Sequence, residues 1–150
     1  MAYTLSNRSL DKLGGVNEDL VKVVKKAIEL TKVDFGVIYG MRTQEEQQKL
    51  FDAGKSQTMK SKHLTGDAVD LMAYVDGKAS WELNLYDDLA DAMKWAATEE
   101  GVVIRWGAAW HIDDISTWDG TMEEAMMAYI DLRRSQGRRP FIDGPHFELN

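Results

Sequence analysis

The segment SKHLTGDAVD, residues 61–70, places a histidine and an aspartate, His63 and Asp70, seven residues apart with small residues around them. Neutral imidazole and carboxylate are both good zinc ligands. The small residues allow the backbone to turn tightly, so the two side chains can converge on one ion. Taken alone, this spacing is a weak signal, because a polar loop that leads into a strand has a similar composition.

A catalytic zinc site needs a third protein ligand and an open position, where the pKa of a bound water falls to about 7. The chain contains no cysteine, so that ligand must be His, Asp or Glu. We expect it to be His146, at the start of the segment HFEL. His111, in the segment WHIDD, is the alternative.

Hydrolysis also requires a base and a group that stabilises negative charge. Asp143 precedes His146 by three residues across a Gly-Pro turn, and a carboxylate beside a dication is suited to take the proton of the attacking water. Arg42 can bind an oxyanion or a substrate carboxylate through its planar guanidinium. Gln47 lies close to Arg42, one turn into a predicted helix. Taken singly, Asp143 is equally a turn residue and Arg42 a surface cation.

These residues must be positioned by helices and strands that the apolar patterns, capping boxes and glycines indicate. We predict helices over residues 17–32, 43–54, 84–100 and 121–134, with Gly101 just past the end of the third. We predict strands over residues 34–40, 68–74, 102–106 and 146–149. The intervening segments 55–67 and 107–120 are expected to be irregular and to form or cover the site.

Helices and strands do not alternate here as regular βαβ units. The pattern therefore predicts a single α+β domain over residues 1–150, with helices packed on a small, largely antiparallel sheet that carries the zinc site. A chain of this length can bury a substantial core, and its content of 44% hydrophobic residues is typical of globular proteins.

The net charge of −7 argues against a nucleic-acid-binding function that depends on neutralising phosphates. The segment RRSQGRR carries a basic cluster, which we interpret as a solvated helix end in preference to a patch for an anionic polymer: Arg133, Arg134, Arg138 and Arg139. The chain has no apolar run near the roughly 20 residues that span a bilayer. We therefore expect no stable membrane association.

Several motifs, in order along the chain, resemble one family of zinc metallopeptidases. SKHLTGDAVD fits the pattern SxHxxGxAxD, the first zinc motif of lysostaphin-like, D-Ala-D-Ala and hedgehog-type peptidases, and DGPHF resembles the second. DFGVIYGMRTQEEQQKLFDAGKSQT and RWGAAW extend the match along most of the chain. The whole set is most similar to the phage endolysin branch, the L-alanyl-D-glutamate peptidases.

The resemblance implies a role for each candidate residue. His63, Asp70 and His146 would bind zinc, and Asp143 would be the catalytic base. Arg42 would bind the substrate or the oxyanion. The resemblance also implies that two further residues shape the pocket, Ser61 and Gln47.

Three other positions bear on which branch the chain resembles. D-Ala-D-Ala peptidases usually carry Glu in place of Asp143, so the aspartate favours the endopeptidase branch. The chain departs from its relatives at Asn17, where His is frequent, and at Ala109, where an acidic residue is common. Neither position is a proposed ligand.

The implied substrate is the peptidoglycan stem peptide, cut between L-alanine and D-glutamate. The start of the chain lacks the pattern of a secretory signal, so we expect synthesis in the host cytoplasm, access to the periplasmic wall through a holin-type pore, and a monomeric enzyme. The alternatives are a D-Ala-D-Ala carboxypeptidase or dipeptidase with the same site and a non-catalytic wall-binding module. Calcium could bind the acidic pairs Asp87–Asp88 and Asp113–Asp114, although solvated carboxylates are the favoured interpretation.

Overall fold

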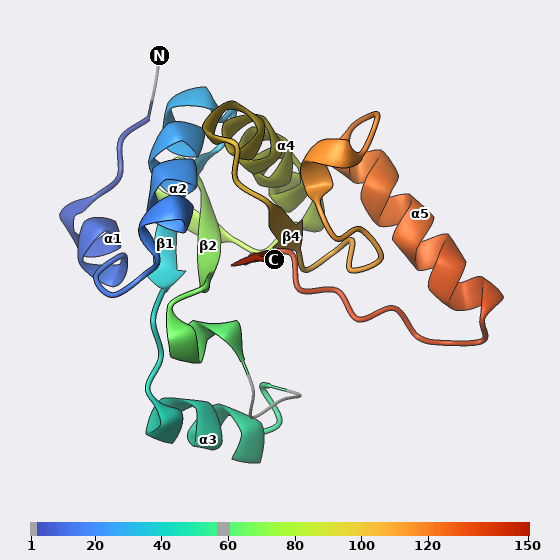
Figure 1. Cartoon of the computed structure of the whole chain (residues 1–150), viewed down its shortest axis with the longest axis horizontal. Helices are drawn as coiled ribbons and strands as arrows, with labels where there is room; N and C mark the ends of the chain where they lie inside the picture. Colours follow the sequence, from blue (N-terminus) through green and yellow to red (C-terminus); the bar gives the residue numbers. More distant parts are fainter. Residues whose placement is uncertain (1–2, 57–60) are drawn as a thin grey trace.

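The computed structural model describes residues 3–56 and 61–150 (Figure 1). Its helices are α1 (Asn7–Lys12), α2 (Glu18–Leu30), α3 (Gln44–Asp52), α4 (Leu83–Glu100) and α5 (Met122–Ser135), with short 3-10 helices η1 (Lys62–Thr65) and η2 (Ile115–Thr117). Its strands are β1 (Asp34–Tyr39), β2 (Ala68–Val75), β3 (Lys78–Ser80), β4 (Ile104–Trp106) and β5 (His146–Leu149).

The strands form one sheet in the order β1-β2-β5-β4, and β3 pairs with the far end of β2. Every pairing is antiparallel. The predicted α+β fold with helices on a small antiparallel sheet is therefore confirmed. No described helix is long and apolar enough to cross a membrane.

The two faces of the sheet have different surroundings because side chains alternate along a strand. On β2, Val69 and Leu71 are fully buried in the hydrophobic core. Helices α2 and α4, which pack against each other, contribute the apolar side chains of that core: Leu20, Val23, Val24, Leu89 and Met93. Asp70, between Val69 and Leu71, faces the opposite side, where the polar residues of the candidate site gather.

The predicted helices and strands are present, with shifts of one to two residues at several ends. The helix predicted to end near Lys32 ends at Leu30, because Thr31 is extended and its hydroxyl bonds the backbone of Val33. The first capping box is also present: Thr43 accepts from the Glu46 backbone N–H, and the Glu46 side chain accepts from the Thr43 backbone N–H. Thr121 and Glu124 cap α5 in the same way.

Two elements were not predicted. Helix α1 is only six residues long, too short for a clear apolar period, and is capped by Ser6. Strand β3 follows the Asp76-Gly77 turn, where both residues have positive φ. Asp-Gly is a strong hairpin signal, so this strand was detectable in the sequence. Within the segments expected to be irregular, η1 and η2 form single turns; residues 57–60 lie outside the described part.

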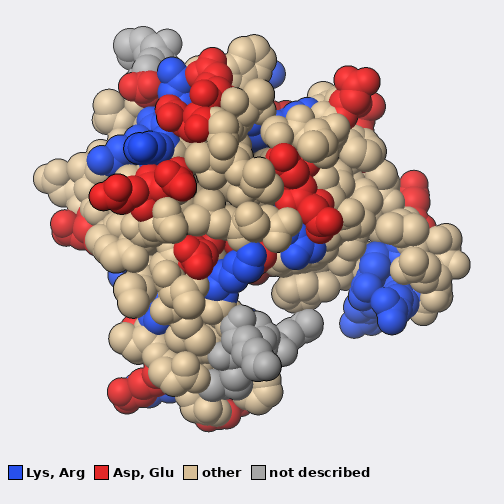
Figure 2. Space-filling model, viewed as in Figure 1, with Lys and Arg blue, Asp and Glu red and all other residues tan. Residues whose placement is uncertain are grey.

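The basic cluster lies at the free end of α5 and in the loop that follows, where Figure 2 shows blue side chains gathered. Arg133 and Arg134 lie in the last turn of the helix. The Arg133 guanidinium donates to the carbonyl of Arg139 at 3.2 Å through Nη2, so it ties the loop back to the helix. This arrangement favours the helix-end interpretation for Arg133.

Candidate metal centre and active site

Strand pairing places the second and third candidate ligands side by side. Asp70 on β2 pairs directly with His146 on β5. His146 Nδ1 lies 3.1 Å from Asp70 Oδ1. The two residues are far apart in the chain, so the antiparallel register between these strands builds this half of the site.

The first candidate ligand, His63, lies in η1 and is buried. Ser61 caps this turn, and its hydroxyl accepts from the His63 backbone N–H at 3.2 Å. The turn ends at Gly66, where φ is +77° and an added Cβ would lie 2.4 Å from the carbonyl oxygen of Gly15. Glycine is therefore required both by conformation and by space, which explains its place in the motif.

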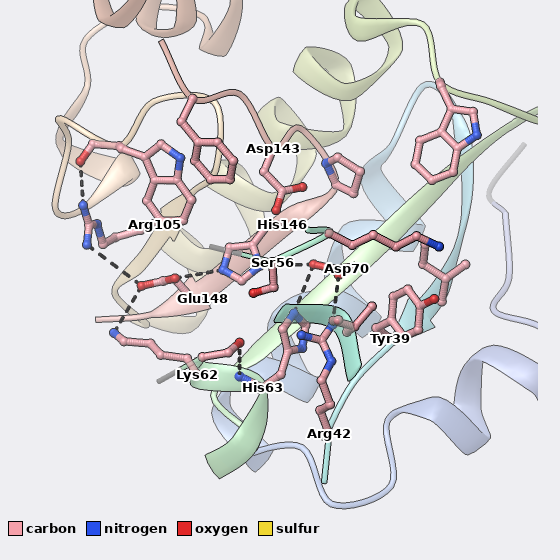
Figure 3. Close-up of a pocket in the computed structure, with 18 residues that line it drawn as sticks. Tyr39, Arg42, Ser56, Lys62, His63, Asp70, Arg105, Asp143, His146 and Glu148 are labelled. Atoms are coloured by element: carbon pink, nitrogen blue, oxygen red, sulfur yellow. Dashed lines mark hydrogen bonds and ion pairs between the residues drawn. The ribbon is translucent and has the colours of Figure 1, made fainter. Parts of the chain in front are cut away.

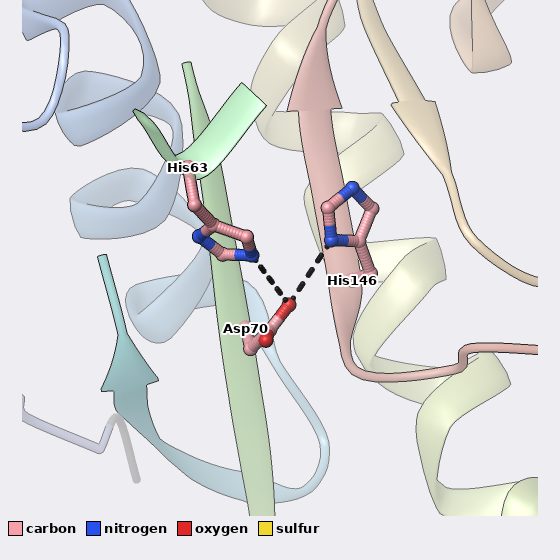
Figure 4. A group of neighbouring side chains, drawn as sticks. All are labelled: His63, Asp70 and His146. Atoms are coloured by element: carbon pink, nitrogen blue, oxygen red, sulfur yellow. Dashed lines mark hydrogen bonds and ion pairs between the residues drawn. The ribbon is translucent and has the colours of Figure 1, made fainter. Parts of the chain in front are cut away.

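The two imidazoles use opposite nitrogens toward the shared centre (Figure 4). His63 Nδ1 lies 2.7 Å from the Gly40 carbonyl, so it carries the hydrogen of the neutral ring and leaves Nε2 as a lone-pair donor. His146 Nε2 lies 2.8 Å from Glu148 Oε1, so Nε2 carries the hydrogen of the neutral ring and Nδ1 is the lone-pair donor. Both free nitrogens face Asp70 Oδ1, at 3.2 and 3.1 Å.

This arrangement fits a zinc ion. The three donor atoms lie within 4.8 Å of one another. Ligands about 2.0–2.2 Å from a tetrahedral zinc are roughly 3.3 Å apart, close to the separations seen here. Two imidazoles and one carboxylate are also a donor set that suits zinc. The group His63, Asp70 and His146 can therefore hold a metal ion.

The electrostatics of the group are those of a site for a cation. Burial alone would raise the pKa of Asp70. In the metal-free form in which the nitrogens of His146 and His63 that face Asp70 carry hydrogens, their hydrogen bonds outweigh burial and hold that pKa well below its usual range. Burial alone would lower the pKa of His146, but hydrogen bonds with Asp70 and Glu148 raise it to about 9. Asp70 is therefore ionised, and His146 must release a proton before Nδ1 can ligate a metal.

Asp143 lines the same pocket, and Figure 3 shows its carboxylate pointing inward. Its backbone N–H donates to Gly107 O at 2.8 Å, and its carbonyl accepts from the His146 backbone N–H at 3.1 Å. An added Cβ on Gly107 would lie 2.2 Å from the Asp143 carbonyl oxygen, so only glycine permits this approach. Burial, and then the negative charge of Asp70, raise the pKa of Asp143, as suits a group that accepts and returns a proton.

Arg42 is buried beside the candidate ligands. Its Nη2 lies 3.8 Å from Asp70 Oδ2, and its Nη1 donates to Gln47 Oε1 at 2.6 Å. Gln47 is itself fully buried and donates to Ser56 Oγ at 2.8 Å. The guanidinium is therefore held in one orientation, and Gln47 acts on the pocket through Arg42.

The pocket over this group has a volume of about 520 Å³, in the range of sites for small molecules and peptides. Its wall includes four cationic side chains, Arg42, Lys55, Lys62 and Arg105, and three carboxylates, Asp70, Asp143 and Glu148. Aromatic rings line it as well: Tyr39, Trp81, Trp110 and Phe141. The pocket thus combines apolar walls with charged groups of both signs.

Other candidates lie elsewhere in the structure. His111 contacts the rings of Tyr129 and Trp118, with centroids 5.6 and 6.2 Å away, so His146 and not His111 completes the group. Asp114 caps η2 through Ser116. At the departures from the family pattern, Asn17 caps α2, and Ala109 is buried in the core.

The sequence interpretation missed Glu148, which is buried and lies against His146. The sequence could have indicated Glu148, because it lies two residues after His146 and residues two apart on a strand point to the same face. Once HFEL is read as a strand that carries a ligand at His146, Glu148 belongs on the face of the site.

Comparisons with known proteins point to one family of peptidases. The model of the family described as phage L-alanyl-D-glutamate peptidase matches residues 1–150. The L-alanyl-D-glutamate peptidase of Escherichia phage T5 is 34% identical over 131 residues, which cover 80% of this chain and 96% of that enzyme. The crystal structure of the Serratia marcescens L-Ala D-Glu endopeptidase ChiX matches with a TM-score of 0.72 and 35% identity, over 96% of this chain and 87% of that one. The chain therefore belongs to the phage L-alanyl-D-glutamate peptidase family.

Proposed function

We propose that this protein is a zinc-dependent peptidoglycan endopeptidase that hydrolyses the L-alanyl-D-glutamate bond of the stem peptide and so lyses the host cell wall. The observation that carries the proposal is the convergence of His63, Asp70 and His146 on one point inside the pocket that Asp143 lines. Membership of the family supports the peptidase activity and the bond.

In this proposal His63 Nε2, Asp70 and His146 Nδ1 hold the metal. When bound, zinc supplies a Lewis acid for the scissile carbonyl and for the attacking water. The remaining steps belong to the side chains around it.

Asp143 is the general base and then the general acid. Its carboxylate takes a proton from the attacking water and returns it to the amide nitrogen of the leaving D-glutamate, which departs as an amine. The raised pKa of Asp143 favours the first step, because a more basic carboxylate takes the proton of the attacking water more readily.

Arg42 is assigned to the oxyanion or to a substrate carboxylate. Its fixed orientation beside Asp70 places a permanent positive charge at the reacting end of the pocket. We assign Ser61 and Gln47 supporting roles, since Ser61 orders the turn that carries His63 and Gln47 orients Arg42.

We assign the lysine and arginine side chains that lie on several sides of the pocket as partners for the carboxylates of the acidic stem peptide. For the cellular setting we propose a monomeric enzyme, made in the host cytoplasm and reaching the periplasmic wall through a holin-type pore. The net charge of −7 is unfavourable for a competing interaction with nucleic acid.

The test is mass spectrometry of Gram-negative-type peptidoglycan digested with the protein, with chelator, and with chelator followed by added zinc. We expect zinc-dependent release of stem peptides that begin at D-glutamate. Release of D-alanine alone would indicate a carboxypeptidase instead. An absence of products from zinc-loaded protein would indicate a wall-binding module.

A further inference from the structure

Glu148 shares a strand face with the candidate ligand His146. It is 7% exposed, and its Oε1 lies 2.8 Å from His146 Nε2. A neutral imidazole carries one hydrogen, and a carboxylate can only accept it. This contact therefore places the hydrogen on Nε2 and leaves Nδ1 free toward Asp70.

Glu148 is itself held from two neighbouring segments (Figure 3). Lys62 Nζ lies 3.3 Å from Glu148 Oε2 and also donates to the Leu149 carbonyl. Arg105, which pairs across β4 and β5 with Glu148, places Nη1 3.9 Å from the same oxygen. Because Lys62 directly precedes His63, one carboxylate connects the turn that carries the first histidine with the strand that carries the second.

The two histidines have different hydrogen-bond acceptors behind their metal-facing nitrogens. His63 Nδ1 meets the Gly40 carbonyl, a neutral acceptor fixed by the backbone. His146 meets a carboxylate side chain, which Lys62 and Arg105 hold in place from the other side. An ionised acceptor fixes the ring more strongly than a neutral one and makes the opposite nitrogen a better donor to a metal.

We propose that Glu148 is a positioning residue that selects the Nδ1-ligating form of His146 and ties it, through Lys62, to the turn that bears His63. The proposal rests on the proposed function only in taking the group around Asp70 as a metal site. A merely structural ion pair would stabilise the sheet in the same way without changing metal affinity, so the test must separate these two effects.

The test compares zinc affinity by competition with a chromophoric chelator in wild-type protein, Glu148→Leu and Glu148→Gln. We expect Glu148→Leu to weaken zinc binding by about 10–100-fold. Glu148→Gln should lose less, because its amide oxygen can still accept from Nε2 when the side chain turns that way. The matched control is Glu99→Leu, which removes an ion pair of the same length, Glu99–Lys26 at 3.3 Å, on the far helix α4.

A second measurement needs no variant. In the ¹⁵N spectrum of zinc-loaded wild-type protein, we expect His146 to carry its hydrogen on Nε2 and His63 on Nδ1. The opposite form for His146 would overturn the proposal. So would zinc affinities of both Glu148 variants within twofold of Glu99→Leu, with only the melting temperature lowered.

These readouts are independent of the reaction. If the digest released products of another bond, the proposed function would fail while the zinc affinities and the tautomer still decided the role of Glu148. If the digest gave the expected peptides but Glu148→Leu bound zinc normally, the endopeptidase assignment would stand and the positioning role would fall.

Discussion

Two regions of this protein bury carboxylates, and their surroundings are opposite. Asp70 lies between two imidazoles with Arg42 3.8 Å away. Asp87, on the buried side of α4, lies near three other carboxylates: Asp88, Glu123 and Asp91. The interactions around Asp70 hold its pKa well below its usual range, whereas burial and then the neighbouring acids raise the pKa of Asp87 to about 6.

The difference shows why acidic residues alone do not indicate a cation site. Around Asp70 the histidines supply lone pairs whose directions are fixed by Gly40 and Glu148, so the donors face one point. Around Asp87 the charges repel one another, and Asp91 is already used to accept from the backbone N–H of Met122 at 2.8 Å. One region is organised for a cation, and in the other the burial of Asp87 and then repulsion by its acidic neighbours oppose the ionised form. The predictions below test that contrast, starting with the largest expected effect.

Removing one residue from each region should have very different consequences. We expect His63→Ala to lose bound zinc and to lower hydrolysis by at least about 10³-fold, because only two protein ligands remain. Asp88→Ala, a substitution beside Asp87 in the second region, should retain both bound zinc and hydrolysis. Zinc content by atomic absorption and a peptidoglycan digest measure the effects. Full zinc content in His63→Ala would show that the ligand is a different residue.

The base should be separable from the ligands. Asp143→Ala is expected to keep zinc and the fold but to lower turnover by about 10²–10⁴-fold, because the proton acceptor is gone while the three donors remain. Measurement of zinc content and turnover on the same sample tests this. Unchanged turnover would remove Asp143 from the mechanism, and lost zinc would make it a ligand.

Metal removal should destabilise the first region. The site joins η1, β2 and β5, and a ligand that binds only the folded chain stabilises it. With free zinc about 1000-fold above Kd, the melting temperature should rise by about 10 °C over the chelated protein. The His63→Ala variant is the control and should show little response. Equal melting temperatures of wild-type protein with and without chelator would contradict the proposed site.

The features of the fold and the site that could be predicted from the sequence are those that neighbouring residues in the chain specify. The capping boxes at Thr43 and Thr121, and the glycines that follow α3 and α4, are short-range signals. They located the helix ends to within one or two residues. The donor types in SKHLTGDAVD and DGPHF are likewise local. Their order along the chain was sufficient to indicate the family, which the comparisons confirm.

The site geometry was less accessible because it is made by contacts between distant segments. Nothing near Asp70 in the chain specifies that it pairs with His146; the register between β2 and β5 does. The network of Glu148 with Lys62 likewise joins a strand to a turn far away in sequence. Gln47 was expected at the pocket, but its burial behind Arg42 depends on how α3 packs.

The last prediction relieves the repulsion in the second region. Asp87→Asn should raise the melting temperature at pH 7 by a few degrees, on the order of 5 °C, because a buried charge beside other acids is removed. Zinc content and turnover should be unchanged. Thermal unfolding of wild-type and variant protein across a pH series measures the effect.

The sign of the pH dependence makes this prediction specific. The pKa of Asp87 is about 6 in the folded protein and about 4 in an unfolded chain. Well below pH 4 both states are protonated, so the wild type and Asp87→Asn should have similar stability there. As the pH rises from 4 to 6 the unfolded chain ionises first, and the wild type loses stability relative to the variant. A difference between the two proteins that is constant from pH 4 to 7 would mean that Asp87 affects packing and not charge, and the contrast with Asp70 would then lose its electrostatic basis.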